Sequence, residues 1–227
     1  MIGEPVALTV RRSIERPSAA VLRAFKGRPT GFITDAFNGR GCLDYAIKPL
    51  EPRMRFCGPA VTAFCGPMDN LAAMAILDYA KKGDVIVIAA AGDVTAATIG
   101  DLWAIWAKKI GVAAIVSDGL VRDVGGLLRA GIPVFARGIK PNSSFKNGPG
   151  EINLGVTCGG VHIAPGDIVA GDLDGVVSVP LAQADAVAER LKEVEKKEAD
   201  AEAKIKRGEK LKFWNPDALQ GRIRFVD

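Results

Sequence analysis

The chain has 227 residues, of which 48% are hydrophobic, and its formal net charge at pH 7 is +4. This composition is typical of a globular protein with a sizeable core, and it argues against a disordered or fibrous chain. The longest apolar stretches are much shorter than the roughly twenty residues that span a bilayer, and no basic, aromatic-laced block indicates nucleic-acid binding. We therefore expect neither a membrane nor a nucleic acid as a partner.

Residues with nitrogen or sulfur donors are few. His162 is the one histidine, and Cys42, Cys57, Cys65 and Cys158 form no C-x-x-C pair. A multi-histidine metal site cannot be built from one such chain, and the wide cysteine spacing favours reduced thiols over structural zinc. The N-terminus lacks the apolar run and the cleavage site of a secretory signal, so we expect a cytoplasmic protein. Any catalysis would use carboxylates, Arg, Lys, water or a hard metal ion.

Helical and strand-like segments alternate through the first two-thirds of the chain. Apolar periodicity predicts helices at 18–26, 69–81, 101–109 and 123–130. Runs rich in β-formers predict strands at 59–65, 84–89, 112–116 and 133–137. This alternation indicates an α/β protein with a partly parallel sheet, in which sites gather at the carboxyl ends of the strands.

The composition changes twice in the last third. From 139 to 180, Gly, Pro, Asn and Asp punctuate short runs, which predicts loops and β-hairpins that form a second β layer. Within it, the strand-like "GGVHIA" leads us to expect His162 as a packed or hydrogen-bonded core residue. A long, charged helix follows from residue 181. The simplest organisation is one α/β domain over 1–180 and a helical C-terminal arm over 181–227.

The arm carries a carboxylate on its apolar face. Steps of three and four residues trace one stripe along the predicted helix, which consists of Val187, Leu191, Val194, Glu198, Ala201 and Ile205. In one interpretation the arm is largely exposed, or Glu198 pairs with a nearby lysine. In the other, Glu198 points into a polar site on a neighbouring subunit.

A second feature is the start of the helix predicted at 101–109. A glycine-bearing loop ends at Gly100, and Asp101 opens the amphipathic helix. Asp is a favoured N-cap, but the free N–H groups of Leu102 and Trp103 and the helix dipole also favour a bound carboxylate or phosphate. Taken alone, Asp101 is better explained as a cap, so a functional role depends on its neighbours.

Such neighbours follow in "SDGLVRDVGG", directly after the next strand. We expect Asp118 to be a turn residue, and Asp123 has an ordinary role available as the N-cap of the helix at 123–130. Twenty residues, predicted as one helix and one strand, separate Asp101 from Arg122, so the two loops should lie close together. An Arg fork can hold a carboxylate bidentately, and a carboxylate beside it can hold a hard divalent ion. Together these groups suit a keto acid.

The G-D and R-D pairs at this spacing, with "PGDIVAGDLDGVVSVP" downstream, resemble the class II 4-hydroxy-4-methyl-2-oxoglutarate / 4-carboxy-4-hydroxy-2-oxoadipate aldolases. They equally resemble the relatives of these enzymes, the regulators of ribonuclease activity A. The resemblance extends from about "GFITDAFNGRG" to the arm. It implies an α-β-β-α sandwich like the swivelling phosphohistidine-type domain, a homotrimer or homohexamer with sites between subunits, and bound Mg²⁺ or Mn²⁺.

The same resemblance implies roles around the metal. Asp123 would be its direct ligand, Arg122 would contact the pyruvyl or enolate moiety, and Asp101 would hold a metal-bound water.

Further roles concern the substrate and the arm. The backbone at Gly100, Leu102 and Trp103 would receive the substrate carboxylate. In the aldolase branch a glutamate from a neighbouring subunit's arm also holds metal waters; Glu198 is the matching position, with Glu195 as the second choice.

The sequence departs from the aldolases in two places. "AGDLDG" stands where three consecutive acidic residues are common, and we expect Asp167, Asp172 and Asp174 to be structural rather than metal-binding. Bulky Trp103 and Trp106 follow Asp101 and could reshape the pocket.

The leading hypothesis is metal-dependent retro-aldol cleavage of a 4-hydroxy-2-oxo di- or tricarboxylic acid to pyruvate and a second keto acid. A metal-associated water polarised by Asp101 and Glu198 would be the base, and oxaloacetate decarboxylation would be a side activity. The main alternative is a non-enzymatic regulator of a ribonuclease, a type that ends near the position of Val179. A phosphohistidine carrier that uses His162 is a third, weaker idea.

Overall fold

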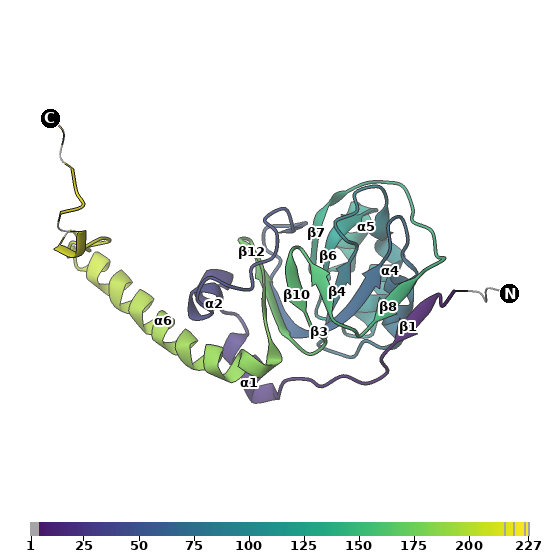
Figure 1. Cartoon of the computed structure of the whole chain (residues 1–227), viewed down its shortest axis with the longest axis horizontal. Helices are drawn as coiled ribbons and strands as arrows, with labels where there is room; N and C mark the ends of the chain where they lie inside the picture. The colour runs from purple at the N-terminus through teal and green to yellow at the C-terminus, as the bar shows by residue number, and fades with distance from the viewer. Residues whose placement is uncertain (1–4, 216, 220, 225, 227) are drawn as a thin grey trace.

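A mixed, mostly parallel sheet forms the centre of the molecule (Figure 1). The structure is a computed structural model that describes residues 5–215, 217–219, 221–224 and 226. The strands follow the order β1-β8-β3-β4-β6-β7-β2, with β5 beside β6, and β3, β4, β6 and β7 run parallel. Their bounds are β1 Leu8–Val10, β2 Lys48–Pro49, β3 Phe56–Cys65, β4 Val85–Ala89, β5 Ala97–Ile99, β6 Ala114–Val121, β7 Val134–Ile139 and β8 Gly150–Ile152.

A second β layer covers one face of this sheet. It contains the hairpins β9 (Val156–Cys158) with β10 (Val161–Ile163) and β11 (Ile168–Asp172) with β12 (Gly175–Val179). The long strand β3 joins the layers, because its first residues pair with β11 and its later residues pair with β4. The hairpins predicted for 139–180 are confirmed.

Helices lie outside the β layers. One group is α3 (Leu71–Ala75), α4 (Asp101–Lys109) and α5 (Val124–Ala130); the other is α1 (Ala19–Phe25), α2 (Thr30–Ala36) and α6 (Ala184–Lys206). Short 3₁₀ helices are η1 (Ile76–Asp78), η2 (Leu181–Gln183) and η3 (Asp217–Leu219). Apolar clusters fill the spaces between helices and sheet, between the β layers, and between the second layer and α1, α2 and α6. The predicted mixed α/β fold with a long C-terminal helix is confirmed.

Strand β6 is longer than predicted. The apolar run suggested 112–116, but the strand continues to Val121, and Asp118 lies inside it with 4% of its surface exposed. Asp118 is therefore not the expected turn residue. Its carboxylate accepts hydrogen bonds from the N–H groups of Ala90 and Gly159, which satisfy a buried charge within a strand.

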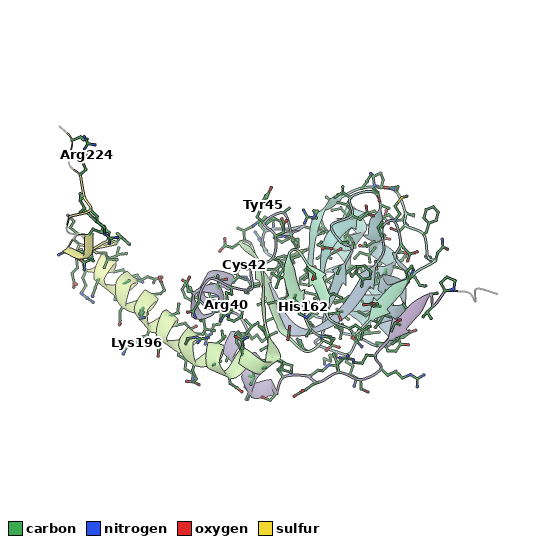
Figure 2. All side chains as sticks on the ribbon, viewed as in Figure 1. Arg40, Cys42, Tyr45, His162, Lys196 and Arg224 are labelled. Carbon is green, nitrogen blue, oxygen red and sulfur yellow. The ribbon has the colours of Figure 1, made fainter. Side chains whose placement is uncertain are left out.

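His162 also differs from expectation. It lies on β10 with its side chain exposed rather than packed in the core (Figure 2). The β9–β10 hairpin is a separate two-stranded sheet, and successive residues of β10 point to opposite faces, so His162 is exposed while the next residue, Ile163, is buried. Asp167 and Asp172 are structural as predicted: Asp167 accepts N–H bonds from Ala164 and Leu181, and Asp172 binds both the N–H and the hydroxyl of Thr30 at the start of α2.

The helix α6 has two different halves. Ala184, Val187, Ala188 and Leu191 are buried against α1 and α2. Beyond them the helix extends away from the sheet on the side opposite α4 and α5 (Figure 1). Lys196 lies on this part of the helix, and Arg224 lies in the segment that follows it (Figure 2). The predicted boundary between the domain and the arm at residue 180 thus divides one apolar cluster, which the first half of α6 shares with α1 and α2. No helix in the described part of the chain is long and apolar enough to cross a membrane.

Candidate functional site

The pairing of β5 with β6 brings the two predicted loops together. These strands are parallel, and Ile99 and Val121, the last residue of each, are partners in the register. The N–H of Arg122 also donates a 3.1 Å hydrogen bond to the carbonyl of Ile99. Gly100 and Asp101 therefore leave the sheet beside Arg122 and Asp123, as the sequence predicted. The short strand β5, which makes this contact, was not predicted.

Gly100 leaves room for the charged pair. An added Cβ there would lie 2.5 Å from Oδ2 of Asp123 and 3.3 Å from Nε of Arg122. A side chain at this position would shift the Asp123 carboxylate, so the glycine is favoured by the close approach and not by its dihedral angles.

Asp101 is the first residue of α4, and Gly100 occupies the N-cap position. The Asp101 carboxylate accepts a 2.7 Å hydrogen bond from the N–H of Leu102, so this donor is already engaged before any substrate binds. A negative charge here is favoured by the helix dipole. The carboxylate also lies over Gly126 of α5, where an added Cβ would collide with it. Asp101 thus joins the starts of α4 and α5.

Asp123 has an unusual backbone. It precedes α5 in a left-handed conformation, with φ 59° and ψ 42°, and its side chain makes no capping hydrogen bond. Such a conformation costs on the order of 1 kcal/mol for a residue other than glycine, and it is frequent at functional sites. The carboxylate instead pairs with Nε of Arg122 at 3.3 Å and is 45% exposed. The N-cap explanation of Asp123 is not supported by this geometry.

Arg122 is held from a second side by a loop that sequence reasoning missed. Its Nη1 donates a 2.6 Å hydrogen bond to Oγ of Ser143, and the neighbouring Ser144 donates to the carbonyl of Ala97. The loop was recognised only as polar and rich in Gly and Pro. The one sequence signal for these serines was the polar run "NSS" in this loop. Their position beside Arg122 depends on the bridge between Ser143 and Ala97 of β5, which are distant in sequence.

These elements surround a pocket of about 300 Å³. Its wall consists of Asn70, Met74, Ala97, Thr98, Ile99, Gly100, Asp101, Leu102, Trp103, Arg122, Asp123, Ser143, Ser144 and Lys146. Trp103 reaches the pocket, but it is anchored in the core, and its indole N–H donates to the carbonyl of Ala73. Trp106 is half-exposed and is not part of the wall. The pocket therefore contains every predicted site residue except those of the arm.

The arm glutamates are not part of this pocket's wall, and the distal half of α6, which carries them, extends away from α4 and α5 (Figure 1). Glu195 forms an ion pair with Arg28, with Nε and Oε1 2.9 Å apart. Glu198 is exposed, and it has no ion pair or hydrogen bond within the described residues. A contribution of Glu198 to a site therefore requires another copy of the chain.

The donor set at the pocket suits a hard cation with a partly water-filled shell. Among the described residues, no group of three or more His, Cys, Asp or Glu side chains is gathered in one place. Asp101 and Asp123 supply two carboxylates, and Mg²⁺ is commonly bound through one or two carboxylates plus water and substrate oxygens. No cysteine is among the described residues that form the wall of this pocket, so thiolates are not part of this donor set.

Comparisons with known proteins agree with this arrangement. A family model described as "RraA-like: Aldolase/RraA" matches residues 30–178. A Halalkalibacterium halodurans protein named "Putative 4-hydroxy-4-methyl-2-oxoglutarate aldolase" is 42% identical over 180 residues, 79% of this chain and 84% of that protein.

Solved structures show the same similarity. Streptomyces coelicolor RraAS2, described as an unusual member of the RNase ES inhibitor RraA protein family, has a TM-score of 0.76 and 26% identity, covering 83% of this chain and 100% of that one. The RNA-processing inhibitor RraA from Thermus thermophilis has a TM-score of 0.62 and 28% identity, covering 67% of this chain and 93% of that one.

Proposed function

Because this chain belongs to the RraA-like family of aldolases and RraA proteins, we propose that it is a divalent-metal-dependent aldolase. Its substrate is a 4-hydroxy-2-oxo di- or tricarboxylic acid, which it cleaves to pyruvate and a second keto acid. The observation that carries the proposal is the pairing of Ile99 with Val121, which places Asp101 beside Arg122 and Asp123 at one pocket. Oxaloacetate decarboxylation would be a side activity.

In this proposal Asp123 holds Mg²⁺ or Mn²⁺ directly, and Asp101 holds water nearby. When bound, the cation supplies Lewis-acid stabilisation of the negative charge that develops on the pyruvyl half. The Asp123 carboxylate makes no capping hydrogen bond to α5. The carboxylate is thus available as a ligand.

Arg122 binds and stabilises the pyruvyl half. Ser143 and Asp123 fix the guanidinium from two sides, so its remaining N–H groups are held in place to receive a substrate carboxylate or carbonyl oxygen. When the bond between C3 and C4 breaks, its electron pair forms the enolate of pyruvate. Donors arranged in advance around such a charge can each contribute several kcal/mol to lowering the barrier.

The cleavage also needs a base for the 4-hydroxyl proton. We assign this step to a water that Asp101 and Glu198 of a neighbouring subunit hold by hydrogen bonds. Backbone N–H groups at the start of α4, in particular that of Trp103, would bind a substrate carboxylate, and one at Leu102 would first have to leave Asp101. The arm then packs on a neighbouring subunit of a homotrimer or homohexamer.

The test is a lactate-dehydrogenase-coupled assay for pyruvate with 4-hydroxy-4-methyl-2-oxoglutarate and oxaloacetate, with Mg²⁺ or EDTA added. We expect pyruvate only with the metal. Arg122→Gln should lower turnover at least about 100-fold, since it removes the charged donor. Arg129→Gln, at the other end of α5, is the matched control and should retain turnover. The absence of metal-dependent pyruvate from both substrates would contradict the proposal.

The second candidate is a non-enzymatic regulator of a ribonuclease, which the names of the RraA proteins favour. The match to the Thermus protein covers 67% of this chain, and Glu198 lies on α6 of this chain. We favour the enzyme because a protein-binding regulator needs neither this arm carboxylate nor the charged pocket. Inhibition of a ribonuclease by Arg122→Gln as strongly as by the unchanged chain would support the regulator.

A further inference from the structure

A second pocket, of about 600 Å³, lies between the loop after β4, the middle of β6 and β7, and the β9–β10 hairpin. Its wall consists of Phe64, Ala91, Gly92, Asp118, Arg137, Glu151, Gly155, Val156, Thr157, Gly159 and Gly160. Within the described residues it shares no wall residue with the Arg122 pocket. Its volume lies in the range of about 300–1,000 Å³ that is usual for small-molecule sites. The proposed aldolase reaction gives this pocket no role.

Arg137 is fixed in the wall of this pocket. Its Nε donates a 2.9 Å hydrogen bond to the carbonyl of Asp118, and its Nη2 donates a 3.1 Å bond to Oδ2 of Asp44. The N–H of Ala46 and then Arg137 lower the pKa of Asp44, so this partner stays charged. No acceptor for Nη1 lies within the described residues. A guanidinium held in this way loses little freedom when it binds a carboxylate.

Asp118 fixes the loops that surround Arg137. Its buried carboxylate accepts a 2.6 Å bond from the N–H of Ala90 and a 3.2 Å bond from the N–H of Gly159. The turn after Ala90 passes through two left-handed residues, Ala91 with φ 51° and Gly92 with φ 68°. These loops come from distant parts of the chain, and Asp118 holds them on β6. The pocket is therefore formed before any ligand binds.

The remaining wall residues define the ligand. Glu151 on β8 is half-buried and has no ion pair within the described residues, and Phe64 and Val156 provide apolar surface. Among the residues that the structure describes, the wall thus contains the carboxylates of Asp118 and Glu151 and a single guanidinium, that of Arg137, which disfavours polyanions such as phosphate esters. A ligand with one carboxylate and one hydrogen-bond donor matches this charge pattern.

We propose that this pocket binds a small monocarboxylate that carries an ammonium or hydroxyl group and an apolar side chain. Arg137 receives the carboxylate, Glu151 accepts the hydrogen bond from the ammonium or hydroxyl, and the apolar part contacts Phe64 and Val156. The source is an amino acid or a 2-hydroxy acid, which share this chemistry. The proposal does not depend on the aldolase activity.

The test is calorimetric titration of the full chain, in EDTA, with L-phenylalanine, L-phenyllactate and 3-phenylpropionate. These ligands have the same carbon skeleton and differ only in the ammonium, hydroxyl or hydrogen at C2. We expect 3-phenylpropionate to bind at least about tenfold more weakly than the better of the other two, since it lacks the donor. Comparison of phenylalanine with phenyllactate distinguishes the two sources.

Variants locate the binding. Arg137→Gln should weaken binding of that better ligand at least about tenfold, and Arg122→Gln, in the other pocket, should leave it unchanged. Glu151→Gln should reduce its advantage over 3-phenylpropionate; this variant keeps the bonds that Arg137 makes to Asp44 and Asp118. If thermal unfolding shows that Arg137→Gln does not fold, Glu151→Gln alone tests whether the ligand binds in this pocket.

The proposal is overturned if no ligand binds the unchanged chain up to about 10 mM. It is also overturned if folded Arg137→Gln binds as well as the unchanged chain, if Glu151→Gln leaves the advantage of the better ligand over 3-phenylpropionate undiminished, or if Arg122→Gln abolishes binding. The titration excludes metal and measures no turnover. Its result therefore does not depend on whether the aldolase assay succeeds or fails.

Discussion

The α4–α5 region and the distal half of α6 both carry predicted site residues, but the chain positions them differently. At the start of α4 and α5, Asp101 and Asp123 are placed by strand pairing, by Gly126 and by Arg122. On α6, Glu198 extends from a helix whose packing ends near Leu191. One half of the proposed site is therefore built by contacts within the chain, and the other half depends on a second copy.

The largest effect is expected at Asp123, in the half that one chain builds. Asp123→Asn removes the proposed metal ligand and should lower metal-dependent pyruvate formation by about 10³-fold, because Lewis-acid stabilisation is worth several kcal/mol. Asn tolerates the left-handed backbone, and the carboxylate makes no cap, so the melting temperature should hardly change. Isothermal titration with Mn²⁺ provides the direct readout. Turnover and Mn²⁺ affinity equal to those of the unchanged chain would exclude Asp123 as the ligand.

The next effect concerns how the two halves of α6 are stabilised. Leu191→Ala should lower the free energy of unfolding by about 2–5 kcal/mol, because it leaves a cavity against α1 and α2. Urea unfolding measures it. Ile205→Ala is the matched change in the distal half, where the side chain is 56% exposed within one chain. Any loss there above about 0.5 kcal/mol must come from a second copy and should grow with protein concentration. A small loss at Leu191 would contradict the packing described above.

A third change tests how tightly the chain positions Asp101. Gly126→Ala places a methyl group where the Asp101 carboxylate lies, and a displacement of about 1 Å can cost about 100-fold in turnover. Gly125→Ala is the matched control, because a Cβ there meets only Nη1 of Arg129 at 3.4 Å. It adds the same methyl group to α5 and should keep full turnover. Equal turnover in both variants would mean that the contact between Asp101 and α5 is unimportant.

The sequence predicted the parts of the fold that depend on local signals. The helix at 101–109 was predicted at its observed bounds, since apolar periodicity and an acidic first turn define it. The approach of Asp101 to Arg122 followed from one helix and one strand between them. Local sequence signals could not show that β6 continues through Asp118. The N–H groups that bind the Asp118 carboxylate come from Ala90 and Gly159, which are distant in sequence.

The same reason explains the missed residues of the site. Ser143 meets Arg122 through a loop whose position depends on its bridge to β5, and a polar loop has no periodicity to reveal this. The exposure of His162 depends on which face of a two-stranded hairpin is covered. The role proposed for Glu198 involves a second copy of the chain, so its sequence pattern left two interpretations open, an exposed arm and a site on a neighbouring subunit.

The smallest expected effect separates the two arm glutamates. Glu198→Ala should lower turnover about tenfold, since it removes one carboxylate that holds water and leaves Asp101 and Asp123 in place. Glu195→Ala should leave turnover unchanged, because Glu195 is already paired with Arg28 in its own chain. Loss of this partly exposed ion pair should lower the free energy of unfolding by less than about 1 kcal/mol. Light scattering should show the same oligomer for both variants. If Glu195→Ala lowers turnover and Glu198→Ala does not, the arm must dock in another register, with the Arg28 pair broken on assembly.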